Sequence, residues 1–186
     1  MTKSVKILLI VNILMYFLSV DLYDKGIDII NPLALYSGQE FSYYQMITHM
    51  FLHSDEIHLL FNMIFLFLFG IIVEKSIGSL NFILLYFLSC LGAALLQLMI
   101  FTGDQSMIGA SGAIFGIVTF SAFVKPSPKI SLVFFDFKIK WFVIFLILSE
   151  FYSIIFEPSA YVAHWAHIGG ALTAMFYYSF TKSIKS

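Results

Sequence analysis

The sequence predicts an all-α membrane protein, and composition, hydropathy and lysine placement all indicate this class. Of its 186 residues, 60% are hydrophobic and 11% charged, and the mean hydropathy is +0.94. A soluble domain of this size is less apolar. The net charge of −1 indicates no nucleic-acid partner, and the lone Cys90 forms no disulfide within the chain. We expect one polytopic domain over residues 1–186, embedded in a lipid bilayer.

Six apolar stretches have about the length that a helix needs to cross roughly 30 Å of hydrocarbon, although the fourth is short. Lys3 and Lys6 stand at the start of the first stretch, as in a signal peptide, but no small-residue cleavage site follows it, so we expect it to remain as a span. The chain between the first and second stretches forms one long loop. Loops of this length usually have a function, so we expect a functional role for this one. The predicted spans are about residues 5–20, 57–74, 80–101, 110–124, 139–156 and 159–181, with the loop at 21–56.

The lysines predict the orientation of these spans. With the N-terminus in the cytoplasm, every lysine except Lys25 falls on the cytoplasmic side, and the chain contains no arginine. This asymmetry follows the positive-inside rule. Both termini are therefore expected in the cytoplasm, and the loop at 21–56 outside.

Four polar residues on three of these spans fall at nearly one depth. We count a rise of roughly 1.5 Å per residue from the cytoplasmic lysine of each span, which places Ser111 at roughly 21 Å and His167 at roughly 22 Å. The same count places His58 and Asn62 at roughly 25 and 20 Å. Polar groups at such depth are costly unless they pair or line a wet cavity. This layer is the candidate site.

The residue types in the layer suit acyl transfer by a serine. Ser111 is the candidate nucleophile, and His167 could take its proton and return it to the leaving amine. The Ser111 backbone N–H, the Asn62 amide and the His58 ring could stabilise an oxyanion. Since we expect no acid at this depth beside the motif, the residues predict a Ser-His dyad rather than a triad.

Several motifs resemble those of the rhomboid intramembrane serine proteases. They extend over essentially the whole chain and are specific only in combination. The motifs are Gly109-Ala110-Ser111-Gly112, Ala166-His167-Ile168-Gly169-Gly170 with Ala174, His58-Leu59-Leu60-Phe61-Asn62, and Gly70, Glu74 and Gly78 in a G-x3-E-x3-G pattern.

The resemblance implies a six-helix rhomboid-like bundle in which Ser111 and His167 are nucleophile and base, and His58 and Asn62 stabilise the oxyanion. It implies cleavage of single-span membrane proteins near the outer face, without cofactor or metal. With the lysine bias, it favours a bacterial cytoplasmic membrane. One departure is that the first loop lacks the Trp-Arg pair of many relatives, which leaves the packing of that loop open.

Two other classes of function remain. A non-catalytic rhomboid-like protein that binds membrane clients would use the same fold, but such proteins normally lack the serine or the histidine, and both are present here. A small transporter would also place polar groups at one depth. We find no inverted half-repeat and no pair of interrupted helices to support it.

Small residues are expected to let the fourth and sixth spans approach closely. Gly112 and Gly116 form a G-x-x-x-G pattern, and Gly170 and Ala174 repeat the small-residue spacing on the sixth span. Close approach of these two spans would bring Ser111 near His167.

The remaining polar residues carry weaker expectations. His49 and His53 are four residues apart and could bind a metal together with His58. No nearby acid or cysteine completes a convincing site and there is no H-E-x-x-H motif, so no metal is expected. Glu74, at the cytoplasmic end of the second span, is expected to bond backbone groups of the next loop, and His164 is expected to be structural. Glu150 either lies beside a substrate gap or bonds a neighbouring helix. The fifth span or the Glu157-Pro158 loop is the expected gate.

Overall fold

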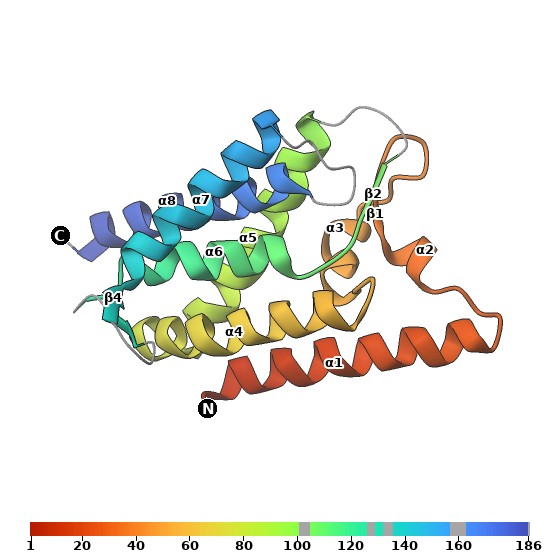
Figure 1. Cartoon of the computed structure of the whole chain (residues 1–186), viewed down its shortest axis with the longest axis horizontal. Helices are drawn as coiled ribbons and strands as arrows, with labels where there is room; N and C mark the ends of the chain where they lie inside the picture. The colour runs from red at the N-terminus through yellow and green to blue at the C-terminus, as the bar shows by residue number, and fades with distance from the viewer. Residues whose placement is uncertain (101–104, 126–128, 132–135, 157–162, 186) are drawn as a thin grey trace.

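The structure is a computed structural model that describes residues 1–100, 105–125, 129–131, 136–156 and 163–185. Long helices form one bundle, as Figure 1 shows, so the predicted all-α class is confirmed. The helices of the bundle are α1 (Lys3–Asp24), α4 (Glu56–Ile77), α5 (Ser79–Ile100), α6 (Ser111–Ser121), α7 (Ile139–Phe156) and α8 (His164–Lys185).

Shorter elements lie between these helices. The long loop contains α2 (Ile30–Leu33), α3 (Gln45–Thr48) and the 3-10 helix η1 (His49–Phe51). Two small antiparallel sheets pair β1 (Leu35–Ser37) with β2 (Gln105–Met107), and β3 (Lys129–Ser131) with β4 (Asp136–Lys138). The first of these sheets ties the long loop to the segment that precedes α6.

Four described helices are long and apolar enough to cross a membrane, namely α1, α4, α5 and α7. Helix α6 is apolar but has only 11 residues. Helix α8 has 22 residues, but it contains His164, His167 and several small or polar residues, and it is not among the four. The chain is thus an integral membrane protein, and six full crossings remain a prediction. The Glu157-Pro158 loop lies outside the described residues.

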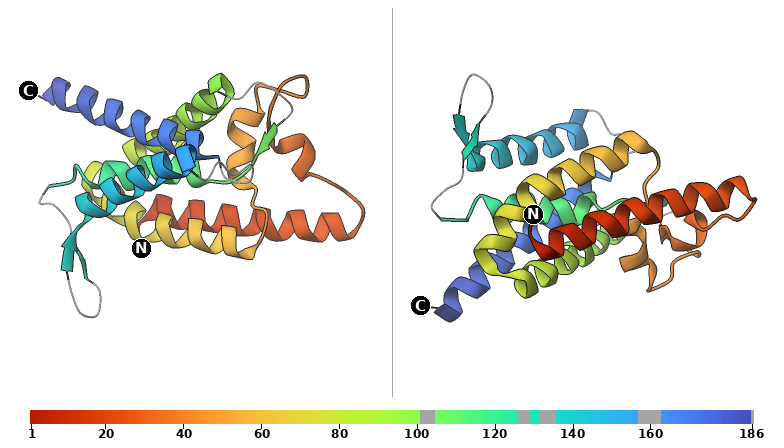
Figure 2. Two further views of the ribbon diagram at one scale, coloured as in Figure 1. Left: turned by 45° about the horizontal axis from the view of Figure 1, so that its top comes forward. Right: turned by 90° about the horizontal axis from the view of Figure 1, so that it is seen from below.

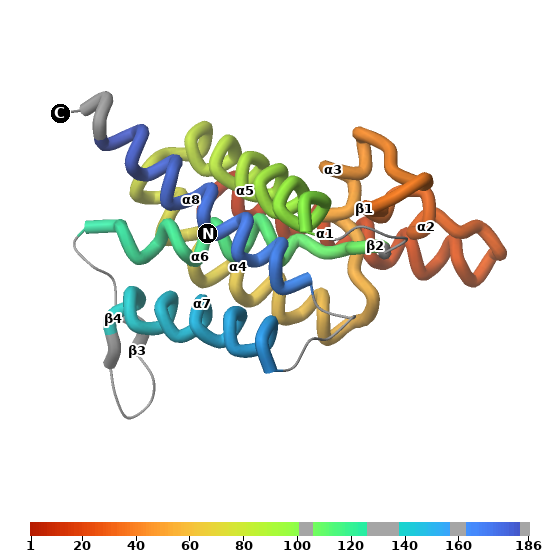
Figure 3. The backbone as a smooth tube through the Cα atoms, turned by 90° about the horizontal axis from the view of Figure 1, so that it is seen from above, coloured from red at the N-terminus to blue at the C-terminus, as the bar shows by residue number. Residues whose placement is uncertain are grey.

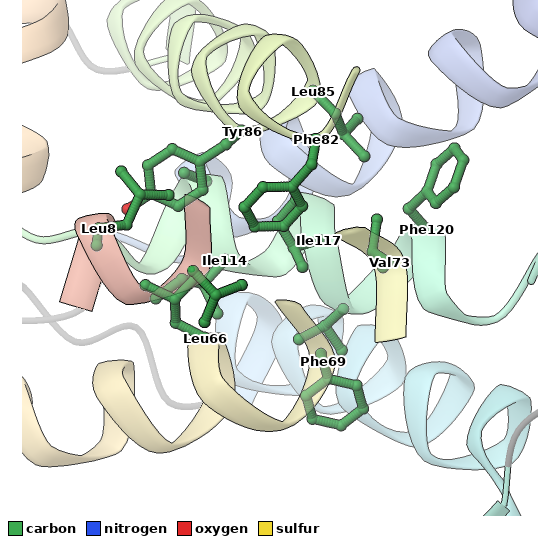
Figure 4. Packing of buried hydrophobic residues seen from close by; sticks show 14 of the residues in the cluster. Leu8, Leu66, Phe69, Val73, Phe82, Leu85, Tyr86, Ile114, Ile117 and Phe120 are labelled. Atoms are coloured by element: carbon green, nitrogen blue, oxygen red, sulfur yellow. The ribbon is translucent and has the colours of Figure 1, made fainter. Parts of the chain in front are cut away.

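Helix α6 occupies the centre of the bundle, where it contacts α4, α5, α7 and α8 (Figures 1 and 2). Of its side chains, only Ser111 and Phe115 are partly exposed. A helix that is apolar on all sides is expected in such a buried position. In Figure 4, Ile114 and Ile117 of α6 lie among side chains of the surrounding helices, including Leu66, Phe69, Phe82 and Tyr86.

Helix α7 lies at the edge of the bundle, as Figure 3 shows. Ile139, Val143 and Glu150 are its only buried residues. Its other side chains are mostly apolar and exposed, which suits a helix whose outer face meets lipid. The ring of Phe142 stacks on that of Phe69 in α4, with the centroids 5.7 Å apart.

Glu74, near the end of α4, joins three elements. Its carboxylate accepts hydrogen bonds from the backbone N–H groups of Ser4 and Val5, both at 2.9 Å, and from the Ser79 hydroxyl at 2.7 Å. The first turn of a helix has unpaired N–H groups, and a carboxylate there also interacts favourably with the helix dipole. Glu74 therefore caps α1 and fixes it against the start of α5, and the backbone groups that it bonds belong to α1 rather than, as expected, to the next loop.

We expect Glu74→Gln to lower the free energy of unfolding by about 2–3 kcal/mol, because charge-assisted hydrogen bonds to buried donors are lost. Thermal unfolding of the detergent-solubilised protein, followed by circular dichroism, measures this change. Glu40→Gln removes the same charge from an exposed position and serves as the control. Equal unfolding temperatures for the two variants would contradict the capping role.

Candidate active site

The serine turn is held by the long loop. After β2, the chain turns at Gly109, whose φ of +119° is a conformation that favours glycine. The Gly109 N–H donates to the carbonyl oxygen of His49 in η1 at 2.9 Å. Together with the pairing of β1 and β2, this bond fixes the position from which α6 begins at Ser111. The loop at 21–56 thus positions the turn.

Ser111 and His167 meet across α6 and α8. The Ser111 Oγ lies 2.8 Å from Nε2 of His167, which is hydrogen-bonding distance. His167 is 8% exposed, and Ser111 is partly exposed at the start of its helix. The structure therefore brings together the two residues that the sequence placed at one depth, with the imidazole able to accept the hydroxyl proton.

Phe115 supports the imidazole of His167, a role that was not predicted from the sequence. Its ring stacks on that of His167 with the centroids 4.2 Å apart and an interplanar angle of 5°. The signal was present, because Phe115 follows Ser111 by four residues and so lies on the same face of α6. The stacking limits rotation of the imidazole away from Ser111.

Helices α6 and α8 approach closely at their small residues. A Cβ atom on Gly170 would overlap the carbonyl oxygen of Gly112, and one on Gly116 would lie 3.0 Å from the carbonyl oxygen of Gly170. Ala174 is fully buried one turn further along α8. The backbones are thus nearly in contact one turn below the Ser111–His167 pair.

His58 borders the serine turn. A Cβ on Gly109 would lie 2.8 Å from Cε1 and Nε2 of His58 and 3.9 Å from the Ser111 Oγ, so the ring and the hydroxyl flank one point. Asp55 caps α4 by accepting from the His58 N–H at 2.8 Å, and this bond lowers the pKa of Asp55. The Ser54 hydroxyl lies 3.1 Å from Nδ1 of His58, which leaves Nε2 directed to the site.

Asn62 lies one turn further along α4 and is 6% exposed. Its side-chain Nδ2 donates to the His58 carbonyl oxygen at 2.9 Å. An amide carries two N–H bonds, and this contact uses one. Asn62 is therefore near the predicted layer, but one of its donors bonds its own helix.

Glu150 of α7 reaches the histidines of α8, and the expectation that no acid stands beside the pair was wrong. Its Oε1 lies 3.1 Å from Nδ1 of His167, and its Oε2 lies 2.6 Å from Nδ1 of His164. The contact with His167 has hydrogen-bonding distance but not alignment, and Nδ1 has no aligned partner among the described residues. Glu150 thus bonds a neighbouring helix, the second of its two expected roles.

The histidines of the long loop are arranged differently from a metal site. His49 Nδ1 bonds the Gln45 carbonyl oxygen at 2.7 Å, and burial lowers its pKa to about 4. His53 is 1% exposed, its ring meets that of His58 edge to face, and burial lowers its pKa to about 3. Both loop histidines are therefore neutral at pH 7.

The donor atoms that could share a metal ion, among the described residues, belong to Glu150, His164 and His167, and they lie within 4.8 Å of one another. Their spacing is equally that of a carboxylate hydrogen-bonded to two imidazoles. An ion there would occupy Nδ1 of His167 and leave Nε2 toward Ser111.

Comparison with known proteins gives the family. The Rhomboid domain model matches residues 40–183. Rhomboid-like protein 11, chloroplastic, of Arabidopsis thaliana is 36% identical over 95 residues, covering 50% of this chain and 34% of that protein. RHOMBOID-like protein 6, mitochondrial, of the same plant is 30% identical over 134 residues, covering 70% of this chain and 41% of that protein.

A bacterial relative aligns over a larger share of its own length. Rhomboid protease GlpG of Haemophilus influenzae is 25% identical over 142 residues, covering 75% of this chain and 70% of that protein. The chain spans less than half of the two plant relatives. The match of the family model covers most of the chain and includes α4 to α7 and nearly all of α8. The chain therefore belongs to the rhomboid family.

Proposed function

We propose that this protein is an intramembrane serine endopeptidase that cleaves single-span membrane proteins by a Ser111–His167 pair. The observation that carries the proposal is the 2.8 Å contact between the Ser111 Oγ and Nε2 of His167 inside a membrane-protein bundle. The names of two relatives, Rhomboid protease GlpG and Rhomboid-like protease 3 of Toxoplasma gondii, support it at the level of the family.

The chemistry follows from the geometry. As the Ser111 oxygen attacks a peptide carbonyl carbon, its proton moves to Nε2 of His167, and the imidazolium then protonates the leaving amine. The Ser111 N–H, the His58 ring and the Asn62 amide are the proposed donors to the oxyanion. Water then attacks the acyl-enzyme with the same histidine as base, which releases the product and regenerates Ser111.

Water reaches Ser111 because α6 is short. Its 11 residues extend over roughly 16 Å, about half of a 30 Å hydrocarbon core. A helix of this length that ends near one surface begins well below the other. A helical substrate must also unwind before cleavage, because its own turns shield the peptide bond. We therefore expect small or helix-weakening residues at the cleaved bond.

Location is part of the proposal. The lysine asymmetry supports cytoplasmic termini and an active site facing outward, and we propose a bacterial cytoplasmic membrane because one of the relatives is from a bacterium, Haemophilus influenzae. The two plant relatives are named as chloroplastic and mitochondrial proteins. The proposed chemistry uses side chains alone, with no cofactor or metal.

The proposal is tested by reaction of the detergent-solubilised full chain with a fluorophosphonate probe. We expect covalent labelling of the wild type, with the adduct mapped by mass spectrometry to Ser111. Thermally unfolded protein is the control, because an unactivated serine is a weak nucleophile. If the wild type stays unlabelled while another rhomboid protease is labelled alongside it, the client-binding alternative replaces this proposal.

A further inference from the structure

Glu150 is a buried carboxylate within a helix whose exposed side chains are mostly apolar. It is 8% exposed, and a buried charge in a membrane is stable only with partners that bond it. Among the described residues, its carboxylate meets two imidazoles of α8, one on each oxygen, at 2.6 Å and 3.1 Å. His164 and His167 are three residues apart and so share one face of α8.

We propose that Glu150 is a positioning residue that holds His167 with its ring proton on Nδ1. The inference rests on the proposed function, because only a base has a required tautomer. To accept the Ser111 proton at 2.8 Å, Nε2 must be unprotonated, and a neutral imidazole then carries its proton on Nδ1. That proton needs an acceptor, and Oε1 of Glu150 lies 3.1 Å away.

The imperfect alignment is compatible with this role. Nδ1 of His167 is buried and has no aligned partner among the described residues. Catalytic hydrogen bonds are often poorly aligned without substrate and tighten in the complex. Oε1 and Nδ1 already lie 3.1 Å apart, so only a change of orientation is needed to align them.

The proton balance of the step is simple. When Nε2 takes the Ser111 proton, His167 becomes positively charged, and the Glu150 carboxylate stabilises this charge through the Nδ1–H. The Nδ1 proton stays on His167 and Glu150 remains ionised, as the acid does in serine protease triads. The proton on Nε2 leaves with the amine, so the pair returns to its starting state.

The other contacts of the carboxylate indicate a built support. His164 fixes Oε2 at 2.6 Å, and Phe115 holds the face of the His167 ring. Three elements, α6, α7 and α8, thus fix one imidazole. Because Glu150 is on α7, at the edge of the bundle (Figure 3), any outward displacement of α7 would lengthen its contact with His167.

The test compares wild type with Glu150→Gln in detergent. The buffer contains EDTA, so that no metal ion can bind Glu150, His164 and His167 and affect the result. A glutamine amide donates to Nδ1 and favours the wrong tautomer, so we expect the fluorophosphonate labelling rate and kcat to fall about 10- to 1000-fold with KM unchanged. Ser149→Ala is the matched control on α7, because the Ser149 hydroxyl donates to the Leu146 carbonyl oxygen of the same helix.

A spectroscopic readout separates positioning from a structural role. In protein labelled with ¹⁵N-histidine, we expect the Nδ1–H tautomer of His167 in the wild type and the Nε2–H tautomer in Glu150→Gln, with the signal assigned from His167→Asn. Absence of fluorophosphonate labelling in the wild type would overturn the proposed function alone. The tautomer comparison would still decide the inference about Glu150. An unchanged tautomer in Glu150→Gln would overturn the inference.

A second variant covers the case in which Glu150→Gln does not fold. His164→Asn keeps the Glu150–His167 contact but removes the partner of Oε2 at 2.6 Å. We expect its labelling rate to fall about 3- to 10-fold, less than the loss for Glu150→Gln, since the carboxylate remains but is less fixed. A labelling rate equal to that of wild type would count against the inference.

Discussion

Ser111→Ala is expected to reduce cleavage of a single-span substrate by about 10⁴-fold or more, because it removes the nucleophile. His167→Ala should reduce cleavage by a similar factor, since the hydroxyl at 2.8 Å then lacks its base. The two residues act as one unit, so the double variant should be little worse than either single variant. The initial rate of cleavage, measured in detergent and in liposomes, checks all three.

The matched control for this prediction is Ser121→Ala. Ser121 is a fully buried serine at the other end of α6, and its hydroxyl donates to the Val118 carbonyl oxygen at 2.6 Å. This variant should cleave at nearly the wild-type rate. Ser111→Ala that retains cleavage would disprove the serine mechanism, whereas equal losses in both serine variants would indicate damage to the fold.

Hydropathy marks most helices of the bundle, although α8 is not among the four that are long and apolar enough to cross a membrane. The predicted span at 139–156 has the bounds of α7 (Ile139–Phe156), and that at 57–74 lies within α4 (Glu56–Ile77). Helix α6 ends at Ser121 rather than near 124, because the chain turns at Ala122 and Phe123. A hydropathy pattern does not register such a turn, since the residues that form it are also apolar.

The contacts between the long loop and the segment before α6 could not be predicted from local patterns. The bond from Gly109 to His49 joins residues far apart in the sequence, as does the pairing of β1 with β2. Strands of three residues give no clear alternation. The length of the loop indicated a functional role, but the segment that it contacts could not be identified from the sequence.

Glu150 shows the limit of counting depth from lysines. It follows Lys140 by ten residues, or roughly 15 Å of rise, against roughly 22 Å for His167. The same count therefore places Glu150 several ångströms from the layer, although its carboxylate lies 3.1 Å from the His167 ring. The count assumes that all lysines lie at one level and that helices are upright, and membrane helices tilt by about 20° on average.

Gly170→Leu is expected to separate Ser111 from His167, because α6 and α8 are nearly in contact at this glycine. A side chain there must displace the Gly112 carbonyl oxygen, and an error of about 1 Å at the reacting atoms can reduce the rate about 100-fold. We expect a loss of at least that size in the fluorophosphonate labelling rate, and a lower unfolding temperature. Gly170→Ala should show a smaller loss of labelling rate and a smaller decrease in unfolding temperature.

Ser179→Leu separates this prediction from a general effect of bulk on α8. Ser179 is exposed, and its hydroxyl bonds the Met175 carbonyl oxygen of the same helix, so added bulk there meets lipid rather than α6. We expect its labelling rate and unfolding temperature to stay near wild type. If Gly170→Leu were labelled at the wild-type rate, the close approach at Gly170 would not set the Ser111–His167 distance. The contacts of each residue within its own helix would then have to hold the two side chains together.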